Sequence, residues 1–220
     1  MRGIFRVLRR VAGRGSGRAG HLEKGLSVAG GIAGLTGVML ISQAQLGASA
    51  SVGLVASMGA SAVLLFAVPH GPLSQPWAVL GGHLVSAVVG VACTKVIAQP
   101  MLAAPVAVGL AIGTMHYLRC IHPPGGATAL SAVVGGETVH QLGFHYVLTP
   151  VLLNATIILL VALLFNYPFP WRRYPLALAQ RPAAAVPASA ETDARSAKFR
   201  KRPPKPPVWT SFRLFWHDGL

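Results

Sequence analysis

One short stretch, residues 119–128, holds the densest group of side chains that could do chemistry. It reads RCIHPPGGAT. Arg119 carries a fixed positive charge, and His122 can gain or lose a proton near neutral pH. Thr128 adds a hydroxyl group. Together with free backbone amides, these side chains suit the binding of a small anion.

The backbone of the same stretch is equally specific. Pro123 and Pro124 exclude a continuing helix and bias His122 towards extended geometry, so they are expected to end one helix. Gly125 and Gly126 let the backbone approach a neighbour closely and are expected to begin the next helix. The first N–H groups of that helix would then point into a polar cavity. A tight structural turn between two helices is the alternative interpretation.

Composition indicates where such a site must sit. Hydrophobic residues make up 53% of the 220 residues and charged residues 11%, with a mean hydropathy of +0.56. Soluble domains carry about 25% charged residues, so this deficit argues against a soluble globular protein and for a membrane protein. The charged residues between 25 and 168 are Lys95, Arg119 and Glu137. All but one unit of the net charge of +14 therefore lies in two basic tails, which favour contact with anionic lipid headgroups over nucleic acid.

Six apolar stretches follow one another in the central region, and they predict an all-α polytopic transmembrane helical bundle. They cover residues 25–41, 48–68, 78–98, 101–118, 125–136 and 147–166. A spanning helix needs about 20 residues, so the fifth stretch is short. Their Gly, Ala and Ser content predicts close helix packing.

The chain divides by composition into three parts. They are a basic cytoplasmic tail (1–24), a membrane domain (25–168) and a basic, Pro-rich, largely disordered tail (169–220). Residues 166–175 are expected to leave the membrane, with aromatic rings at headgroup depth and the arginines in water. An even number of spans would place both termini in the cytoplasm. The Arg-rich start also suits a transit peptide.

An internal echo links two of the apolar stretches. Residues 59–63 (GASAV) and 126–130 (GATAL) match in type, 67 residues apart. Two repeats of three segments would have inverted topology, as in many transporters. The second and fifth segments would then be short or broken and would bring Ser61 near Thr128. Chance similarity in a Gly/Ala-rich sequence is the alternative.

The stretch HPPGGATAL (122–130) resembles the naming motif of the HPP family of integral membrane proteins, and residues 58–76 and 81–91 are also similar to that family. The resemblance implies a signature element made by His122, Pro123, Pro124, Gly125, Gly126, Ala127 and Thr128. It also implies four spanning helices, and nitrite transport by analogy with plant chloroplast and cyanobacterial members. The six apolar stretches counted here depart from those four.

The leading hypothesis is therefore a transporter or channel for a small inorganic anion, nitrite by resemblance. The expected binding residues are Arg119, His122, Gly125, Gly126, Thr128 and Ser61. No cofactor is expected, and no enzymatic activity, because no nucleophile–base pair or carboxylate dyad is visible. No metal is expected, because the histidines lack an i, i+4 pair and an acidic cluster. A structural or metal-handling membrane protein is the alternative, the latter because six histidines lie in 25–168. A bacterial inner membrane is the expected location, and a homo-oligomer is compatible with these features.

Overall fold

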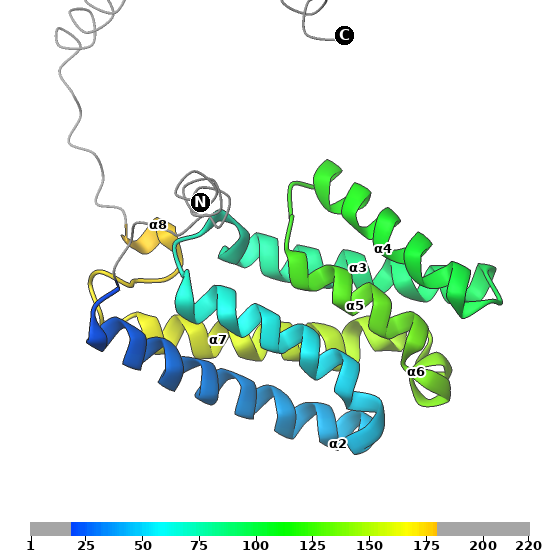
Figure 1. Ribbon diagram of the computed structural model, residues 1–220, viewed down its shortest axis with the longest axis horizontal. Helices are drawn as coiled ribbons and strands as arrows, with labels where there is room; N and C mark the ends of the chain where they lie inside the picture. Colours follow the sequence, from blue (N-terminus) through cyan, green and yellow to red (C-terminus); the bar gives the residue numbers. More distant parts are fainter. Residues whose placement is uncertain (1–18, 180–220) are drawn as a thin grey trace, which may run out of the picture. The chain divides into compact units, whose positions relative to one another are not determined.

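The computed structural model describes residues 19–179, except the side chains of 48–50, and these residues contain helices and no strand. Figure 1 shows their order. The elements are α2 (His21–Ala67), η1 (Pro72–Ser74), α3 (Pro76–Val96), α4 (Pro100–Tyr117), α5 (Pro123–Val134), α6 (Gly136–Leu142), the π-helix η2 (Val147–Leu152), α7 (Leu153–Asn166) and α8 (Leu176–Ala179). The predicted all-α bundle is confirmed. Most of both predicted basic tails lies outside the described residues.

The first two predicted segments form one long element, α2, with a sharp bend. Gly47 has φ 74° and ψ 171°, a conformation open to glycine and strained for other residues. The two halves of α2 therefore run side by side in opposite directions (Figure 1). A Cβ atom placed on Gly30 would lie 2.4 Å from the Phe66 ring, so the absent side chain permits the contact. A Cβ on Gly34 would also meet this ring, at 2.7 Å, whereas one on Gly31 would meet nothing within 4 Å, so the predicted close packing holds for Gly30 and Gly34.

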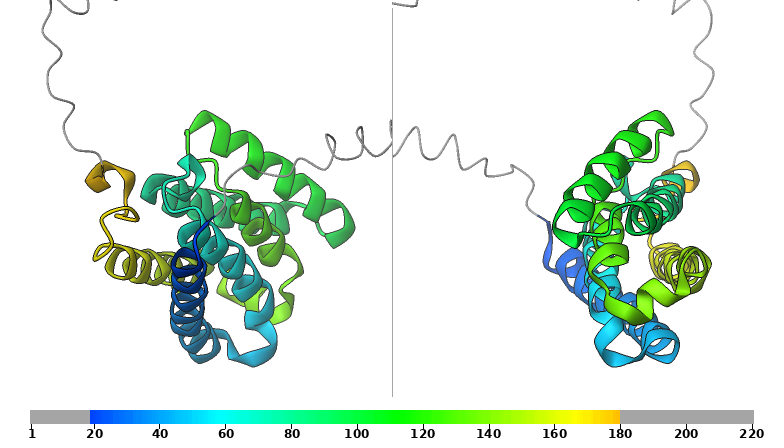
Figure 2. Two further views of the ribbon diagram at one scale, coloured as in Figure 1. Left: turned by 60° about the vertical axis from the view of Figure 1, so that its left-hand side comes forward. Right: turned by 90° about the vertical axis from the view of Figure 1, so that its right-hand side faces the viewer.

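The remaining helices complete the bundle around α3. α3 packs on α4 and α5, whereas α7 packs on α2. The views in Figure 2 show α4 at the edge of the bundle. Close approach between α3 and α5 depends on Gly90, because a Cβ there would lie 2.7 Å from the Ala129 carbonyl oxygen.

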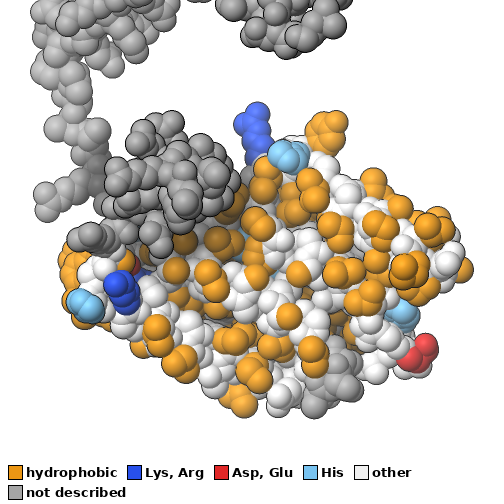
Figure 3. Space-filling model, in the orientation of Figure 1, with side chains coloured by type: hydrophobic (Ala, Val, Ile, Leu, Met, Phe, Trp, Pro, Cys, Tyr) orange, Lys and Arg blue, Asp and Glu red, His pale blue; other side chains and the backbone are white. Residues whose placement is uncertain are grey.

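Four helices in the described part are long and apolar enough to cross a bilayer. They are His21–Gly47, Pro76–Val96, Pro100–Tyr117 and Val147–Asn166. The apolar segments Ser51–Ala67 and α5 are shorter. Figure 3 shows hydrophobic side chains spread over the visible face, with the coloured charged groups at its edges. The protein is thus a multi-pass membrane protein, and the four spans that the resemblance implied are accompanied by two shorter apolar helices.

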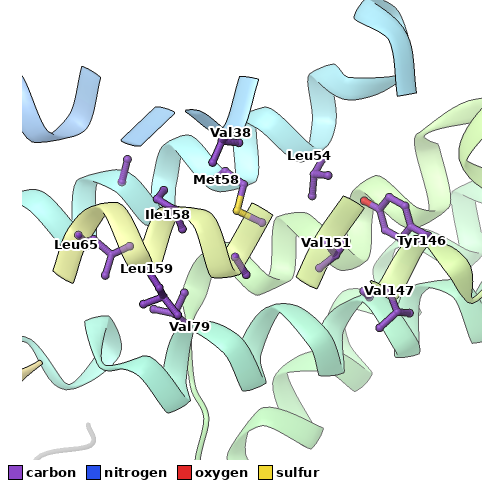
Figure 4. Close-up of a cluster of buried hydrophobic side chains, with 14 of the residues drawn as sticks. Val38, Leu54, Met58, Leu65, Val79, Tyr146, Val147, Val151, Ile158 and Leu159 are labelled. Carbon is purple, nitrogen blue, oxygen red and sulfur yellow. The ribbon is translucent and has the colours of Figure 1, made fainter. Parts of the chain in front are cut away.

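The hydrophobic core joins α2, α3, η2 and α7 (Figure 4). Its labelled members are Val38, Leu54, Met58, Leu65, Val79, Tyr146, Val147, Val151, Ile158 and Leu159. They come from segments far apart in the sequence. The core therefore holds both halves of α2 against α7 and α3.

The packed bundle continues past the predicted boundary at residue 168. Arg172, expected in water, is 1% exposed. Its guanidinium forms an ion pair with Glu23 and donates hydrogen bonds to the Phe66 carbonyl oxygen (2.6 Å) and Asn166 Oδ1 (3.1 Å). This correction has a physical reason, because the ends of α2 and α7 offer enough acceptors to replace water around the charge. The beginning of α2 and the end of α7 therefore lie at the same end of the bundle.

Tyr174 anchors the segment that follows α7 at a second point, two residues after Arg172. Its hydroxyl donates a hydrogen bond of 2.7 Å to the Ser74 carbonyl oxygen. Burial raises the pKa of the Tyr174 phenol above its ordinary value, which keeps the group neutral and able to donate. The segment after α7 is thus part of the folded domain.

Candidate functional site

Five polar side chains form a continuous hydrogen-bonded row inside the bundle, which we call the polar chain. Its members are Ser57 and Ser61 of α2, His83 of α3, His122 just before α5, and Thr128 of α5. Each of them is 0% exposed. Buried polar groups are stable only when hydrogen-bonded, so their arrangement is closely specified.

One end of the polar chain is the His122 imidazole. Its Nδ1 lies 2.8 Å from the Leu73 carbonyl oxygen, and its Nε2 lies 2.9 Å from Ser61 Oγ. A carbonyl oxygen only accepts, so Nδ1 carries a proton. The extended backbone of His122, with φ −141° and ψ 103°, directs the ring towards α2 and α3 and away from the axis of α5.

The other end runs through His83 to the start of α5. His83 Nε2 lies 2.8 Å from Ser61 Oγ, and its Nδ1 lies 2.7 Å from Thr128 Oγ1. Thr128 Oγ1 lies 2.7 Å from Ser57 Oγ, which donates to the Pro124 carbonyl oxygen at 2.7 Å. The two imidazole rings have centroids 4.8 Å apart and planes at 66°. The Ser61 hydroxyl thus sits between two Nε2 atoms.

Local sequence positions these groups. Ser57 and Ser61 are four residues apart, so they share one face of α2. Gly82 makes room for His122, because a Cβ on Gly82 would lie 2.5 Å from His122 Cβ. The next turn of α3 carries Ser86, and a Cβ on Gly125 would lie 2.8 Å from its Oγ.

Three of the predicted site residues are brought together, namely Ser61, His122 and Thr128. Pro123 and Pro124 begin α5 instead of ending a helix, because proline is tolerated where no backbone N–H is required. α4 ends earlier, at Tyr117. The prediction that the helix starts at Gly125 is therefore wrong by two residues.

Two glycines and an alanine of the motif have separate surroundings. Gly125 faces α3, where a Cβ would lie 2.8 Å from the Gly82 carbonyl oxygen. Gly126 borders a mainly apolar groove lined by Val108, Ile112, Met115, His116, Ile121 and Pro123, in place of the polar cavity that we expected. Ala127 is half-buried beside a second apolar groove.

Arg119 is not part of the polar chain. It is exposed and has φ 54° in the turn after α4, while the next residue, Cys120, points into the bundle. The guanidinium forms no hydrogen bond or ion pair within residues 19–179. The expected joint site of Arg119 and His122 is corrected here, because the left-handed turn directs the two side chains differently.

Two members of the polar chain, His83 and Ser57, were not among the predicted residues. An imidazole in the middle of an apolar 21-residue segment is a signal, because ionisable residues within membrane helices are expensive. The i, i+4 pair of serines in the second segment is a weaker one. In the described part, no group of three or more His, Cys, Asp or Glu side chains could hold a metal.

Comparison with known proteins agrees with the signature stretch. Residues 17–175, well over half of the chain, match the HPP transmembrane region. The chain belongs to the HPP family. In this HPP protein, the family stretch supplies two of the five members of the polar chain, His122 and Thr128. The match also includes Arg172 and Tyr174, in agreement with their packing into the bundle.

The relatives that match this protein are described only as transmembrane proteins. Two transmembrane proteins of Dictyostelium discoideum are 45% and 44% identical to this HPP protein over 127 residues. These residues are 56% of the chain and 40% and 44% of the relatives, so the chain spans less than half of their length. No solved structure matches.

Proposed function

We propose that this HPP protein moves a small inorganic anion across the membrane, with nitrite as the first substrate to test, and does not transform one chemically. The observation that carries the proposal is the meeting of two short helices, Ser51–Ala67 and α5, at a buried polar chain. Short or broken helices that present polar groups within the bundle are the plan of many secondary transporters. The family resemblance supports nitrite.

The arrangement of the two halves of the domain supports an inverted repeat. The 67-residue offset relates Ser57 to Pro124, and Ser57 Oγ donates to the Pro124 carbonyl oxygen. In Figure 1 the first half of α2 runs opposite to α4, and α3 runs opposite to α7. α3 packs on α4 and α5, as α7 packs on α2. Two repeats related in this way would exchange access between the two sides of the membrane.

In this scheme, this conformation is a closed state. Ser61, His83 and His122 are 0% exposed, and the groove beside Pro123, Pro124 and Ala127 is apolar. An anion would reach the polar chain after the second half of α2 separates from α5. The hydroxyl and imidazole N–H groups released by that separation would be its hydrogen-bond donors.

Anion flux into liposomes tests this function. Purified protein is reconstituted, and entry of nitrite, nitrate and chloride is measured against protein-free liposomes. We expect His122→Gln to reduce flux at least about tenfold, since it removes a member of the polar chain, and the exposed His116→Gln to leave flux unchanged. Nitrate is included because protonated nitrite can cross a bilayer unaided. Flux of all three anions equal to that of empty liposomes would reject the proposal.

A hydrolase is the second candidate function, because the structure brings a nucleophile and bases together where the sequence analysis expected no such pair. Ser61 Oγ lies 2.8 and 2.9 Å from the Nε2 atoms of His83 and His122. A hydroxyl beside an imidazole is the arrangement of an activated serine. Labelling of Ser61 by a fluorophosphonate, lost in Ser61→Ala, would favour the hydrolase. An unlabelled protein with anion flux would favour transport.

A further inference from the structure

The polar chain has more contacts than protons when both histidines are neutral. Six close contacts, each 2.7 to 2.9 Å, run from one backbone carbonyl to another. They are Leu73 O to His122 Nδ1, His122 Nε2 to Ser61, Ser61 to His83 Nε2, His83 Nδ1 to Thr128, Thr128 to Ser57, and Ser57 to Pro124 O. Two neutral imidazoles and three hydroxyls supply five protons. One contact would then join two lone pairs.

Both ends of the row are fixed acceptors, so most of the protons have only one possible place. His122 Nδ1 donates to Leu73, and Ser57 donates to Pro124. The Ser57 proton is then used, so Thr128 donates to Ser57 and His83 Nδ1 donates to Thr128. Two longer approaches, Ser61 Oγ to the Ser57 carbonyl oxygen at 3.3 Å and Thr128 Oγ1 to the Pro124 carbonyl oxygen at 3.5 Å, add acceptors and no proton.

We infer that the polar chain binds one additional proton, shared by His83 and His122 through the Ser61 hydroxyl. Six protons fill six contacts. Two arrangements then satisfy every contact. In one, His83 is the imidazolium and Ser61 donates to His122. In the other, His122 is the imidazolium and Ser61 donates to His83.

The two arrangements interconvert without a net change in protons. The N–H bond at His83 Nε2 breaks as that proton joins Ser61 Oγ, and the original Ser61 proton leaves to form an N–H bond at His122 Nε2. The positive charge moves from one ring to the other, and the remaining hydrogen bonds keep their direction. Ser61 is therefore a positioning and relay residue between two bases.

The surroundings leave this charge without an acidic partner. α5 and η1 have no ionisable side chain, and those of α2 lie in its first turn, far from Ser61 in sequence. α4 carries the exposed His116 and Tyr117, and α6 carries Glu137 and His140, which are also exposed. α3 adds Lys95, in its last turn and exposed. The Cys120 thiol near Gly81 is the other titratable group close to the imidazoles. An anion arriving beside the polar chain would supply the missing negative charge.

One consequence rests on the proposed function, namely that proton and anion move together. Removal of the additional proton leaves one contact between α2, α3 and α5 without a hydrogen. Proton release therefore favours separation of these helices, and proton binding favours the closed state. The anion, paired with the proton in the closed state, would cross with it in a ratio of one to one.

The proton site is tested without any transported solute. The full chain, labelled with ¹⁵N-histidine, is placed in lipid nanodiscs, and imidazole nitrogen shifts are followed over roughly pH 5 to 8, where histidine changes charge. We expect the Nε2 signals of His83 and His122 to move in one common step that totals one proton. Both rings neutral throughout, or two independent steps that total two protons, would overturn the inference.

Substitutions at Ser61 distinguish one proton shared by the two imidazoles from independent titration of each imidazole. Ser61→Ala should abolish the common step, and Ser61→Thr, which keeps the hydroxyl, should retain it. The exposed His116→Gln and His145→Gln serve as controls, since each removes the signal of one imidazole outside the polar chain and should leave the common step in place. If Ser61→Ala does not fold, the wild-type titration alone still decides.

A flux measurement tests the coupling separately. An inward proton gradient should accelerate nitrate uptake at least fivefold. A common one-proton step with gradient-insensitive nitrate flux would overturn the coupling while leaving the proton site intact. Absence of the step together with clear flux would overturn the proton site while leaving the proposed function intact.

Discussion

The Thr128 hydroxyl of α5 contacts a side chain of α2 and a side chain of α3. Its Oγ1 lies 2.7 Å from both His83 Nδ1 and Ser57 Oγ. Thr128→Val keeps the shape and removes both hydrogen bonds. We expect a loss of about 1–2 kcal/mol in unfolding free energy, since interhelical hydrogen bonds in membranes have this size. Thermal unfolding in detergent measures it, with Thr128→Ser as the control that should stay near wild type.

At Arg119 we expect a substitution to have little effect on anion flux. Its guanidinium is exposed at the end of α4 and lies outside the polar chain. Arg119→Gln should therefore leave anion flux within about twofold of wild type at high salt, where surface charges are screened. A loss of flux comparable to that of His122→Gln would place the guanidinium in the anion path.

Sequence reasoning at the residue scale succeeded where one segment carried the information. The HPPGGATAL motif and the internal echo predicted His122, Thr128 and Ser61, and the structure brings them together. His83 could not be assigned from its own segment, because its partners belong to α2 and α5. Arg172 was wrongly placed in water for the same reason, since two of its partners, Glu23 and Phe66, lie more than 100 residues away.

At the scale of helices, the contact between α3 and the start of α5 positions the polar chain. Gly82→Ala places a Cβ 2.5 Å from His122 Cβ, which displaces the imidazole from Ser61. We expect anion flux to fall at least about tenfold and unfolding free energy to drop by about 1–3 kcal/mol, the usual effect of overpacking. Flux assays and thermal unfolding check the two parts.

Gly109→Ala is the matched control for that substitution. Gly109 lies on α4, and a Cβ there meets nothing within 4 Å. Alanine is the better helix former, so stability should be unchanged or slightly higher. Equal behaviour of the two variants would mean that the α3–α5 approach does not position His122.

Apolar stretches predicted the helices well, but not every joint between them. The bend of α2 at Gly47 lies in the gap between the apolar stretches 25–41 and 48–68, so this joint was predicted. The Pro123-Pro124 pair was read as the end of a helix, although a first turn needs no N–H partner. Such joints depend on which helix lies opposite, and a single sequence does not contain that information.

At the scale of the whole domain, Arg172 joins the beginning of α2 to the end of α7. Arg172→Gln would leave Glu23 without its cation and free the Phe66 carbonyl oxygen. We expect a loss of about 2 kcal/mol, smaller than for a fully buried pair because the Glu23 side chain is 27% exposed. Unfolding measurements test it, and the exposed neighbour Arg173→Gln should change stability little.

Because Arg172 joins the beginning of α2 to the end of α7, both ends of the domain lie on one side of the membrane. Cysteines at Gly20 and Arg173 should be labelled from one face, and a cysteine at Gln99, between α3 and α4, from the other. The buried Cys93 and Cys120 are first replaced by alanine. Labelling of all three positions from one face would contradict this arrangement. The cytoplasmic location of the ends stays a prediction until the labelled face is identified.

The unequal lengths of the outer helices have a consequence for the surrounding lipid. The first half of α2 has 27 residues and α4 has 18, which correspond to about 40 Å and about 27 Å of helix. A hydrocarbon layer of about 30 Å fits neither, so the long helix must tilt, and the acyl chains beside α4 must shorten or disorder. The two helices therefore favour different bilayer thicknesses, and the protein imposes a gradient of thickness around its circumference.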